Sequence, residues 1–162
     1  MYLTKLTDQN IKVYKMEHER LKVSGISFDS RKIKQGMLFA LIKENNQYIS
    51  DALKFGAKAV LCKKRDINNL NKTVKNILVT DDTRLAAAKI AKDFFPYQPR
   101  HISAVTGTNG KTSVVNFLYE IWKQNNINGA SFGTLGIKYK NVYKRTKLTT
   151  LDAITLHREL DN

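Results

Sequence analysis

Cysteine and long apolar runs are nearly absent from this 162-residue chain. A single cysteine excludes an internal disulfide, and Cys62 ends the short apolar run 59–62, which favours a buried strand thiol. No run approaches the roughly 18 apolar residues that span a membrane. The first six residues contain no signal-peptide apolar segment. We therefore expect a cytoplasmic protein without a membrane partner.

Acidic residues are also scarce, with 14 Asp and Glu against 28 Lys and Arg, which gives a formal net charge of +14. Such a balance can indicate a nucleic-acid partner. The basic residues are scattered, however, with local runs only at 63–65 and 138–147, and a coding bias toward lysine, asparagine and isoleucine explains them equally well. Charge without a recognition motif is weak evidence, so we expect no nucleic-acid partner.

Proline occurs only twice, at Pro96 and Pro99. Before it, short apolar runs alternate with helix-like segments, which indicates an α/β layer structure. Strands are expected at 37–42, 59–62 and 76–80, a helix at 48–55, and a polar connection at 63–75. A second helix is expected to start at Asp81 or Asp82, with its apolar side formed by Leu85, Ala88, Ala91 and Phe95. Because proline ends helices, we divide the chain into domains 1–98 and 99–162.

The clearest motif lies just after the prolines. An apolar run at 102–105 predicts a buried strand, the turn 106–113 contains Gly107 and Gly110, and apolar spacing from Val114 to Trp122 predicts a helix. This order is typical of a phosphate-binding loop, in which glycines and the helix N-terminus present N–H groups to an anion. Lys111 can reach terminal phosphates, and the Thr112 hydroxyl can ligate magnesium.

The motif lacks one glycine of the general pattern, because Val105 stands where that glycine is expected. The alternative is an ordinary strand-turn-helix connection with a surface lysine, and the surrounding pattern favours the nucleotide loop. Further on, the sequence predicts a strand at 130–132, a turn at 133–136, a hairpin turn near Asn141 and a helix at 152–160.

Four segments of the chain resemble the Mur ligases, most closely those that add the third amino acid to UDP-N-acetylmuramoyl-L-alanyl-D-glutamate in peptidoglycan precursor synthesis. They are Phe28–Arg31 with Gly36 and Leu38–Phe39, Asp81–Ala86, Thr106–Ser113, and Gly133–Gly136 followed by Leu148–Thr150 and Asp152–Leu160. The resemblance implies a small N-terminal α/β domain that binds a uridine nucleotide. The start of a P-loop, Rossmann-like central domain that binds ATP would follow it.

Site residues follow from the same resemblance. ATP and Mg2+ would be bound by Gly107, Thr108, Asn109, Gly110, Lys111, Thr112 and Ser113, with Lys111 as the catalytic residue and Thr112 as the metal ligand. Ser30, Thr149 and Thr150 would contact the UDP-N-acetylmuramoyl dipeptide. Taken alone, Ser30 is equally consistent with a turn serine, and the two threonines with a helix N-cap.

In the resembled family, ATP phosphorylates the terminal carboxylate of the dipeptide, and an amine then displaces the phosphate. The incoming amino acid, diaminopimelate or lysine, would bind only in a full-length ligase, since the family's residues for it would lie beyond Asn162. We therefore expect a truncated and inactive, or split-gene, form of the ligase. The alternative is a nucleotide-binding module without ligase activity. The turn 43–47 is also shorter than in the family and lacks its glycine.

Overall fold

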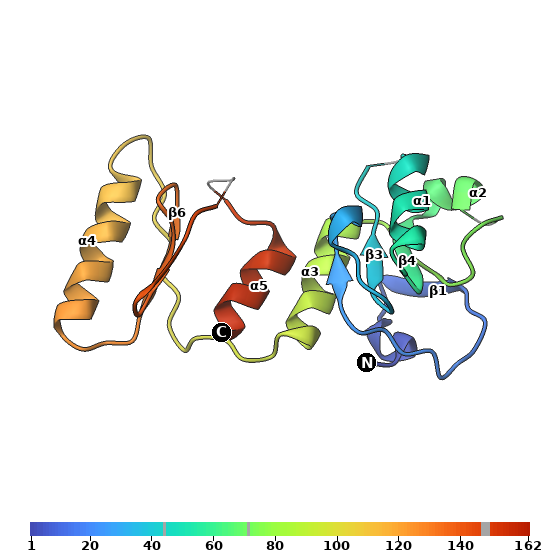
Figure 1. Cartoon of the computed structure of the whole chain (residues 1–162), viewed down its shortest axis with the longest axis horizontal. Helices are drawn as coiled ribbons and strands as arrows, with labels where there is room; N and C mark the ends of the chain where they lie inside the picture. Colours follow the sequence, from blue (N-terminus) through green and yellow to red (C-terminus); the bar gives the residue numbers. More distant parts are fainter. Residues whose placement is uncertain (44, 71, 147–149) are drawn as a thin grey trace. The chain divides into compact units, whose positions relative to one another are not determined.

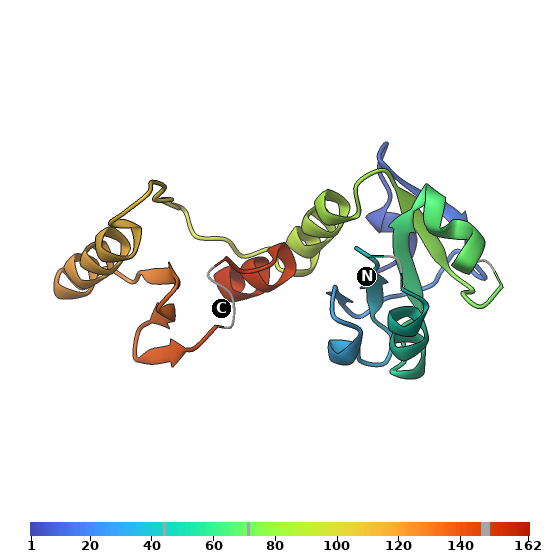
Figure 2. The same ribbon diagram turned by 90° about the horizontal axis from the view of Figure 1, so that it is seen from above.

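The computed structural model describes residues 1–43, 45–70, 72–146 and 150–162 (Figures 1 and 2). They form two compact units, one of residues 1–98 with 153–162 and the other of residues 99–152. The first unit therefore changes to the second after Gln98, and the C-terminal helix belongs to the first unit. The assignment of residues 1–98 and 99–162 to two family domains stays a prediction.

A five-stranded sheet forms the centre of the first unit. Its strands are β1 (Ile11–Lys15), β2 (Ile26–Ser27), β3 (Leu38–Ala40), β4 (Ala59–Lys63) and β5 (Ile77–Thr80), in the order β1-β5-β4-β3-β2. Neighbouring strands from β2 to β5 run parallel, and β1 pairs antiparallel with β5. Strands β3 and β5 are buried along their whole length, as expected where helices cover both faces of a parallel sheet.

Alternate residues of these strands enter two separate apolar clusters. One contains Leu38, Leu61 and Leu78 together with residues of α3 (Thr83–Phe94), α5 (Ala153–Asp161) and the 3-10 helix η1 (Leu3–Leu6). The other contains Phe39, Val60 and Cys62 together with residues of α1 (Asn46–Lys54) and α2 (Ile67–Leu70). The helices thus cover both faces of the sheet, and the α/β fold class is confirmed (Figure 1).

Asx side chains cap the N-termini of α1 and α3 in this unit. The Asn45 side chain accepts from the backbone N–H of Gln47 at 2.9 Å. The Asp82 carboxylate accepts from the N–H groups of Arg84 at 2.9 Å and Leu85 at 3.1 Å, so Asp82, not Asp81, is the cap of α3. These bonds stabilise the ionised form, which lowers the pKa of Asp82, with the Leu85 N–H as the largest cause.

The predicted apolar side of α3 is confirmed at Ala91 and Phe95, which belong to or pack against the core cluster, and is wrong at Leu85. Leu85 is 55% exposed, whereas the buried positions are Thr83, Ala86, Ala87, Ile90 and Ala91. The buried side of the helix starts at its first residue, Thr83. The spacing of alanines alone does not show which side of the helix faces the core. Residues 63–75, expected as a polar connection, contain the 3-10 helix η3 (Lys64–Asp66) and α2. Leu70, the last residue of α2, is fully buried.

The second unit contains α4 (Lys111–Gln124) and a sheet of three antiparallel strands. These are β6 (Ala130–Gly133), β7 (Gly136–Tyr139) and β8 (Val142–Lys144), paired in sequence order. Tyr119 attaches the helix to the hairpin, because it is 7% exposed and its hydroxyl donates to the Lys140 carbonyl at 3.3 Å. Lys138 Nζ also donates to Asn116 Oδ1 at 2.8 Å.

The predicted strand at 102–105 is wrong, since residues 101–106 belong to no strand. A parallel strand needs a neighbour for its backbone N–H and C=O groups. The three strands described in this unit pair only with one another.

Helix α5 packs on α3 within the first unit. Ile154 is 2% exposed in the same cluster as Ala87 and Ala91, and the backbone N–H of Tyr97 donates to Asp161 Oδ1 at 2.7 Å. The helix lies next to α3 in both views (Figures 1 and 2). No helix in the described part of the chain is long and apolar enough to cross a membrane.

Candidate functional site

The glycine loop leads directly into α4. Gly110 occupies the position before the helix with φ +78°, a left-handed conformation that disfavours side chains, and a Cβ there would meet open space. No side chain caps this end of the 14-residue helix. Residues 106–113 are all exposed. The N–H groups of the first turn therefore face solvent at the positive end of the helix dipole, as an anion site requires.

Lys111 folds back over this loop. Its Nζ donates to the carbonyl oxygens of Gly107 and Thr108, the latter at 3.1 Å. Gly107 has φ +141°, which turns the backbone so that these carbonyls and the ammonium group meet. The loop thus holds one cation beside the uncapped helix end, where it can exchange the two carbonyls for phosphate oxygens.

A second polar contact involves a residue to which the sequence assigned no individual role. Thr112 Oγ1 and Thr134 Oγ1 are 2.9 Å apart and share a hydrogen bond. Thr134 lies in the two-residue turn between β6 and β7. The segment 133–136 was identified as a whole, but the contact depends on how the hairpin lies against α4, which spacing along the chain does not reveal. The hydroxyl of Thr112 is therefore oriented by a neighbour.

The donor set fits magnesium bound mainly through phosphates. In the described residues, no group of three or more His, Cys, Asp or Glu could hold a metal ion. Magnesium keeps several waters and is usually held by few protein groups plus substrate phosphates. Thr112 can supply one hydroxyl ligand, and the uncapped N–H groups with Lys111 can hold the phosphates.

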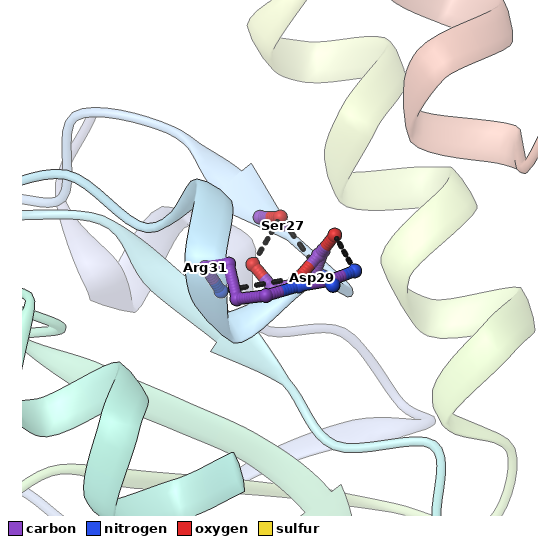
Figure 3. Close-up of polar contacts among 3 residues, drawn as sticks. All are labelled: Ser27, Asp29 and Arg31. Carbon is purple, nitrogen blue, oxygen red and sulfur yellow. Dashed lines mark hydrogen bonds and ion pairs between the residues drawn. The ribbon is translucent and has the colours of Figure 1, made fainter.

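Residues 28–31, which include Ser30, follow β2 in the first unit. Figure 3 shows the polar contacts among Ser27, Asp29 and Arg31. Ser27 Oγ donates to the Asp29 carbonyl and accepts from the Asp29 N–H, both at 3.0 Å. The Asp29 carboxylate accepts from Arg31 Nε and Nη2, both at 2.9 Å, and from the Arg31 backbone N–H at 3.1 Å. These contacts lower the pKa of Asp29, with the Arg31 side chain as the largest cause.

Ser30 itself starts the 3-10 helix η2 (Ser30–Lys32) and is only 5% exposed, whereas the Arg31 side chain is 81% exposed. The exposed charged group at this strand end is therefore the Arg31 guanidinium. The sequence-based prediction named Ser30 and not this ion pair, although an Asp two residues before an Arg is a readable signal for it.

Two further predicted site residues are the threonines at 149 and 150. Thr150 is exposed in the second unit, and Thr149 lies outside the described residues. Cys62 is fully buried, and burial raises its pKa to about 12, which excludes it as a nucleophile near neutral pH. Within the second unit, the predicted site residues that the structure brings together are those of the 107–113 loop.

Comparison with known proteins gives one family. Residues 105–162 match the Mur ligase middle domain. Over 144 residues the chain is 40% identical to the UDP-N-acetylmuramoyl-L-alanyl-D-glutamate--2,6-diaminopimelate ligase of Mesorhizobium japonicum, a match that covers 86% of the chain and 29% of the relative. The protein of the same name from Brucella melitensis is 36% identical over 148 residues, covering 89% and 30%.

A solved structure of a ligase with this name agrees over 99% of the chain, with a TM-score of 0.75 and 27% identity. The match covers 33% of that structure's chain. The present chain therefore spans about a third of the length of the proteins that it resembles.

Proposed function

Since the chain belongs to the Mur ligase family, we propose that it binds Mg-ATP and a UDP-N-acetylmuramoyl dipeptide. These would serve an ATP-dependent ligase of peptidoglycan precursor synthesis. The ligase would add the third amino acid, and its product would contribute to cell wall biogenesis, cell shape and division. The proposed location is the cytoplasm. The observation that carries the proposal is the glycine loop with Lys111 at the uncapped end of α4.

The residues of the loop would act by position and charge. ATP supplies the phosphoryl group that activates the dipeptide carboxylate. The N–H groups after Gly110 would hold the phosphate oxygens, and Lys111 would neutralise the charge that develops during transfer. Thr112 would ligate magnesium with the hydroxyl that Thr134 orients. Asn109 and Ser113 complete the exposed loop.

The dipeptide would contact two separate segments, Ser30 with Arg31 in the first unit and Thr149–Thr150 in the second. Because Ser30 is nearly buried, Arg31 is the better candidate for a direct contact with an anionic group of the nucleotide. The relatives are named as 2,6-diaminopimelate ligases, which supports diaminopimelate over lysine as the third amino acid.

A second candidate is a nucleotide-binding module that performs no ligation. One observation favours it: the turn 43–47 lacks the glycine that the family has there. Ligation requires an amine held in line with the activated carboxylate and shielded from water. We expect the 162-residue chain on its own to form no amide from the dipeptide, ATP and diaminopimelate.

The proposal is tested by calorimetric titration of Mg-ATP into the chain and into Lys111→Ala. A charge-assisted hydrogen bond contributes about 1.5–3 kcal/mol, so the affinity of the variant for Mg-ATP should be lower by about tenfold or more. The matched control is Lys123→Ala, which removes a lysine from the other end of α4 and should leave binding unchanged. Equal affinities of the wild-type chain and Lys111→Ala would reject the phosphate loop.

A further inference from the structure

The glycine loop contains a chemically reactive pair of neighbours, Asn109 and Gly110. The chain has two Asn-Gly sequences, at 109–110 and at 128–129. In such a pair the backbone nitrogen of the glycine can attack the side-chain amide carbon of the asparagine, because glycine has no Cβ to hinder the approach. Both pairs have the same intrinsic chemistry, so the structure around each pair decides how fast it reacts.

No packing restrains the first pair. Asn109 and Gly110 are both exposed, and a Cβ built on Gly110 would meet no atom within 4 Å. The Gly110 carbonyl accepts from the Val114 N–H at 2.9 Å, whereas the Gly110 N–H donates to no acceptor in the part of the chain that the structure describes. The Gly110 nitrogen can therefore approach the Asn109 side chain without breaking a hydrogen bond of its own.

The charge around this pair favours the attack. The reacting species is the deprotonated backbone nitrogen, and nearby positive charge stabilises such an anion. Gly110 directly precedes α4, at the positive end of the helix dipole, and no side chain caps this end. The carbonyls of Gly107 and Thr108 hold the Lys111 ammonium group at the same loop. The helix end and the lysine thus both promote reaction at Gly110.

Packing holds the second pair. Gly129 is half-buried against the ring of Trp122, since a Cβ built on Gly129 would come within 2.5 Å of Trp122 Cε3. The residue before the pair is fixed to the end of α4, because the Ile127 N–H donates to the Trp122 carbonyl at 2.8 Å. Strand β6 begins directly after the pair, at Ala130. Attack on the Asn128 side chain would therefore require local opening of this segment.

We propose that Asn109 is a site of spontaneous deamidation, a covalent modification that disables the glycine loop. The Gly110 nitrogen bonds to Cγ of Asn109, its proton passes to the side-chain amide, and the amide leaves as ammonia. Water then opens the cyclic imide to aspartate or isoaspartate. Either product places a carboxylate in the loop, and isoaspartate also lengthens the backbone, so the modified loop repels phosphate. This consequence rests on the proposed binding of Mg-ATP, whereas the deamidation itself does not.

The test is incubation of the whole chain in neutral buffer, followed by digestion with trypsin and mass spectrometry. Trypsin releases Asn109 in the peptide 101–111 and Asn128 in the peptide 124–138, and fragmentation spectra assign the modified residue. Asn109 should deamidate at least about fivefold faster than Asn128, because only the second site needs local opening. In urea the two rates should converge, since both pairs then lie in an unfolded chain. Equal rates at the two sites in the native chain, or a ratio no larger than in urea, would overturn the inference.

Asn109→Gln is the matched control, because its longer side chain cyclises far less readily and the peptide 101–111 should then stay unmodified. Asn109→Asp carries the charge of the product and should bind Mg-ATP about tenfold more weakly. Equal affinity of Asn109→Asp and the wild-type chain would overturn the stated consequence.

Mg-ATP at about ten times its Kd should slow deamidation at Asn109 about tenfold, because it lowers the fraction of free loop, and should leave Asn128 unaffected. Fast deamidation at Asn109 in a chain that shows no calorimetric binding of Mg-ATP would uphold the modification site and reject the proposed function. The two conclusions therefore fail separately.

Discussion

Removal of the Ile154 side chain tests the unexpected position of the C-terminal helix. Ile154 is 2% exposed and belongs to the main apolar cluster of the first unit, although it lies far along the chain from the other members. If α5 is an integral part of this unit, Ile154→Ala should destabilise the sheet of residues 1–98. A loosely attached tail would leave that sheet unaffected.

The size of the effect follows from the surroundings. Replacing Ile by Ala removes three buried carbon atoms at about 0.8 kcal/mol each, and a cavity that does not collapse adds to this. Of the four buried α3 residues in this cluster, three are alanines (Ala86, Ala87 and Ala91), whose short side chains cannot extend to fill the space. We therefore expect a loss of about 2.5–4 kcal/mol in the free energy of unfolding.

Urea unfolding followed by circular dichroism measures this loss, because Trp122, the single tryptophan, lies in the second unit and does not report on the first. Leu156→Ala is the control, since Leu156 is 36% exposed on the same helix and should cost well under half as much. Equal stability of Ile154→Ala and the wild-type chain would refute the account of α5 as part of the first unit.

Three further predictions concern single contacts. Cys62, fully buried and with its pKa raised by burial, should react with a thiol reagent in the native chain at least about a hundredfold more slowly than in urea, and equal rates would contradict its burial. Arg31→Ala should raise the pKa of Asp29 toward 3.8 in an NMR titration. The stability that this pair contributes should be present above pH 3.8 and disappear as the pH falls through the lowered pKa, and an unchanged titration would refute the pairing. Thr134→Val should weaken binding of Mg-ATP more than of ATP without magnesium, whereas an equal effect on both would exclude a role through Thr112.

The fold of the first unit was readable because each of its main strands is a short apolar run between turn residues. The strands at 59–62 and 76–80 followed from local chemistry alone, as did a helix cap at Asp81 or Asp82, of which Asp82 is the cap in the structure. Local chemistry did not predict which residues of α3 are buried, because the sides of an alanine-rich helix differ little in hydrophobicity. Tertiary contacts decide which of its alanines are buried.

The second unit was less predictable for a different reason. The apolar run 102–105 has the composition of a buried strand, but a strand forms only where a partner supplies hydrogen bonds. The position of α5 likewise depends on Ile154 finding the cluster around α3, which no pattern within 153–161 specifies. In the candidate site, the loop residues followed from their spacing. The Thr112–Thr134 contact could not be predicted, because it depends on the folded hairpin. The choice of Arg31 over Ser30 could not be predicted either, because it depends on the burial of Ser30 in the folded unit.

The most direct test of the central claim separates a ligase part from a general nucleotide-binding module. Hydrogen exchange of the 162-residue chain should be measured with and without saturating UDP-N-acetylmuramoyl-L-alanyl-D-glutamate, with ATP alone as the comparison. The account predicts that the dipeptide substrate slows exchange at Phe28–Arg31, and that Arg31→Ala reduces this protection. Protection at the 106–113 loop by ATP, with no change at Phe28–Arg31 on addition of the dipeptide substrate, would contradict the account.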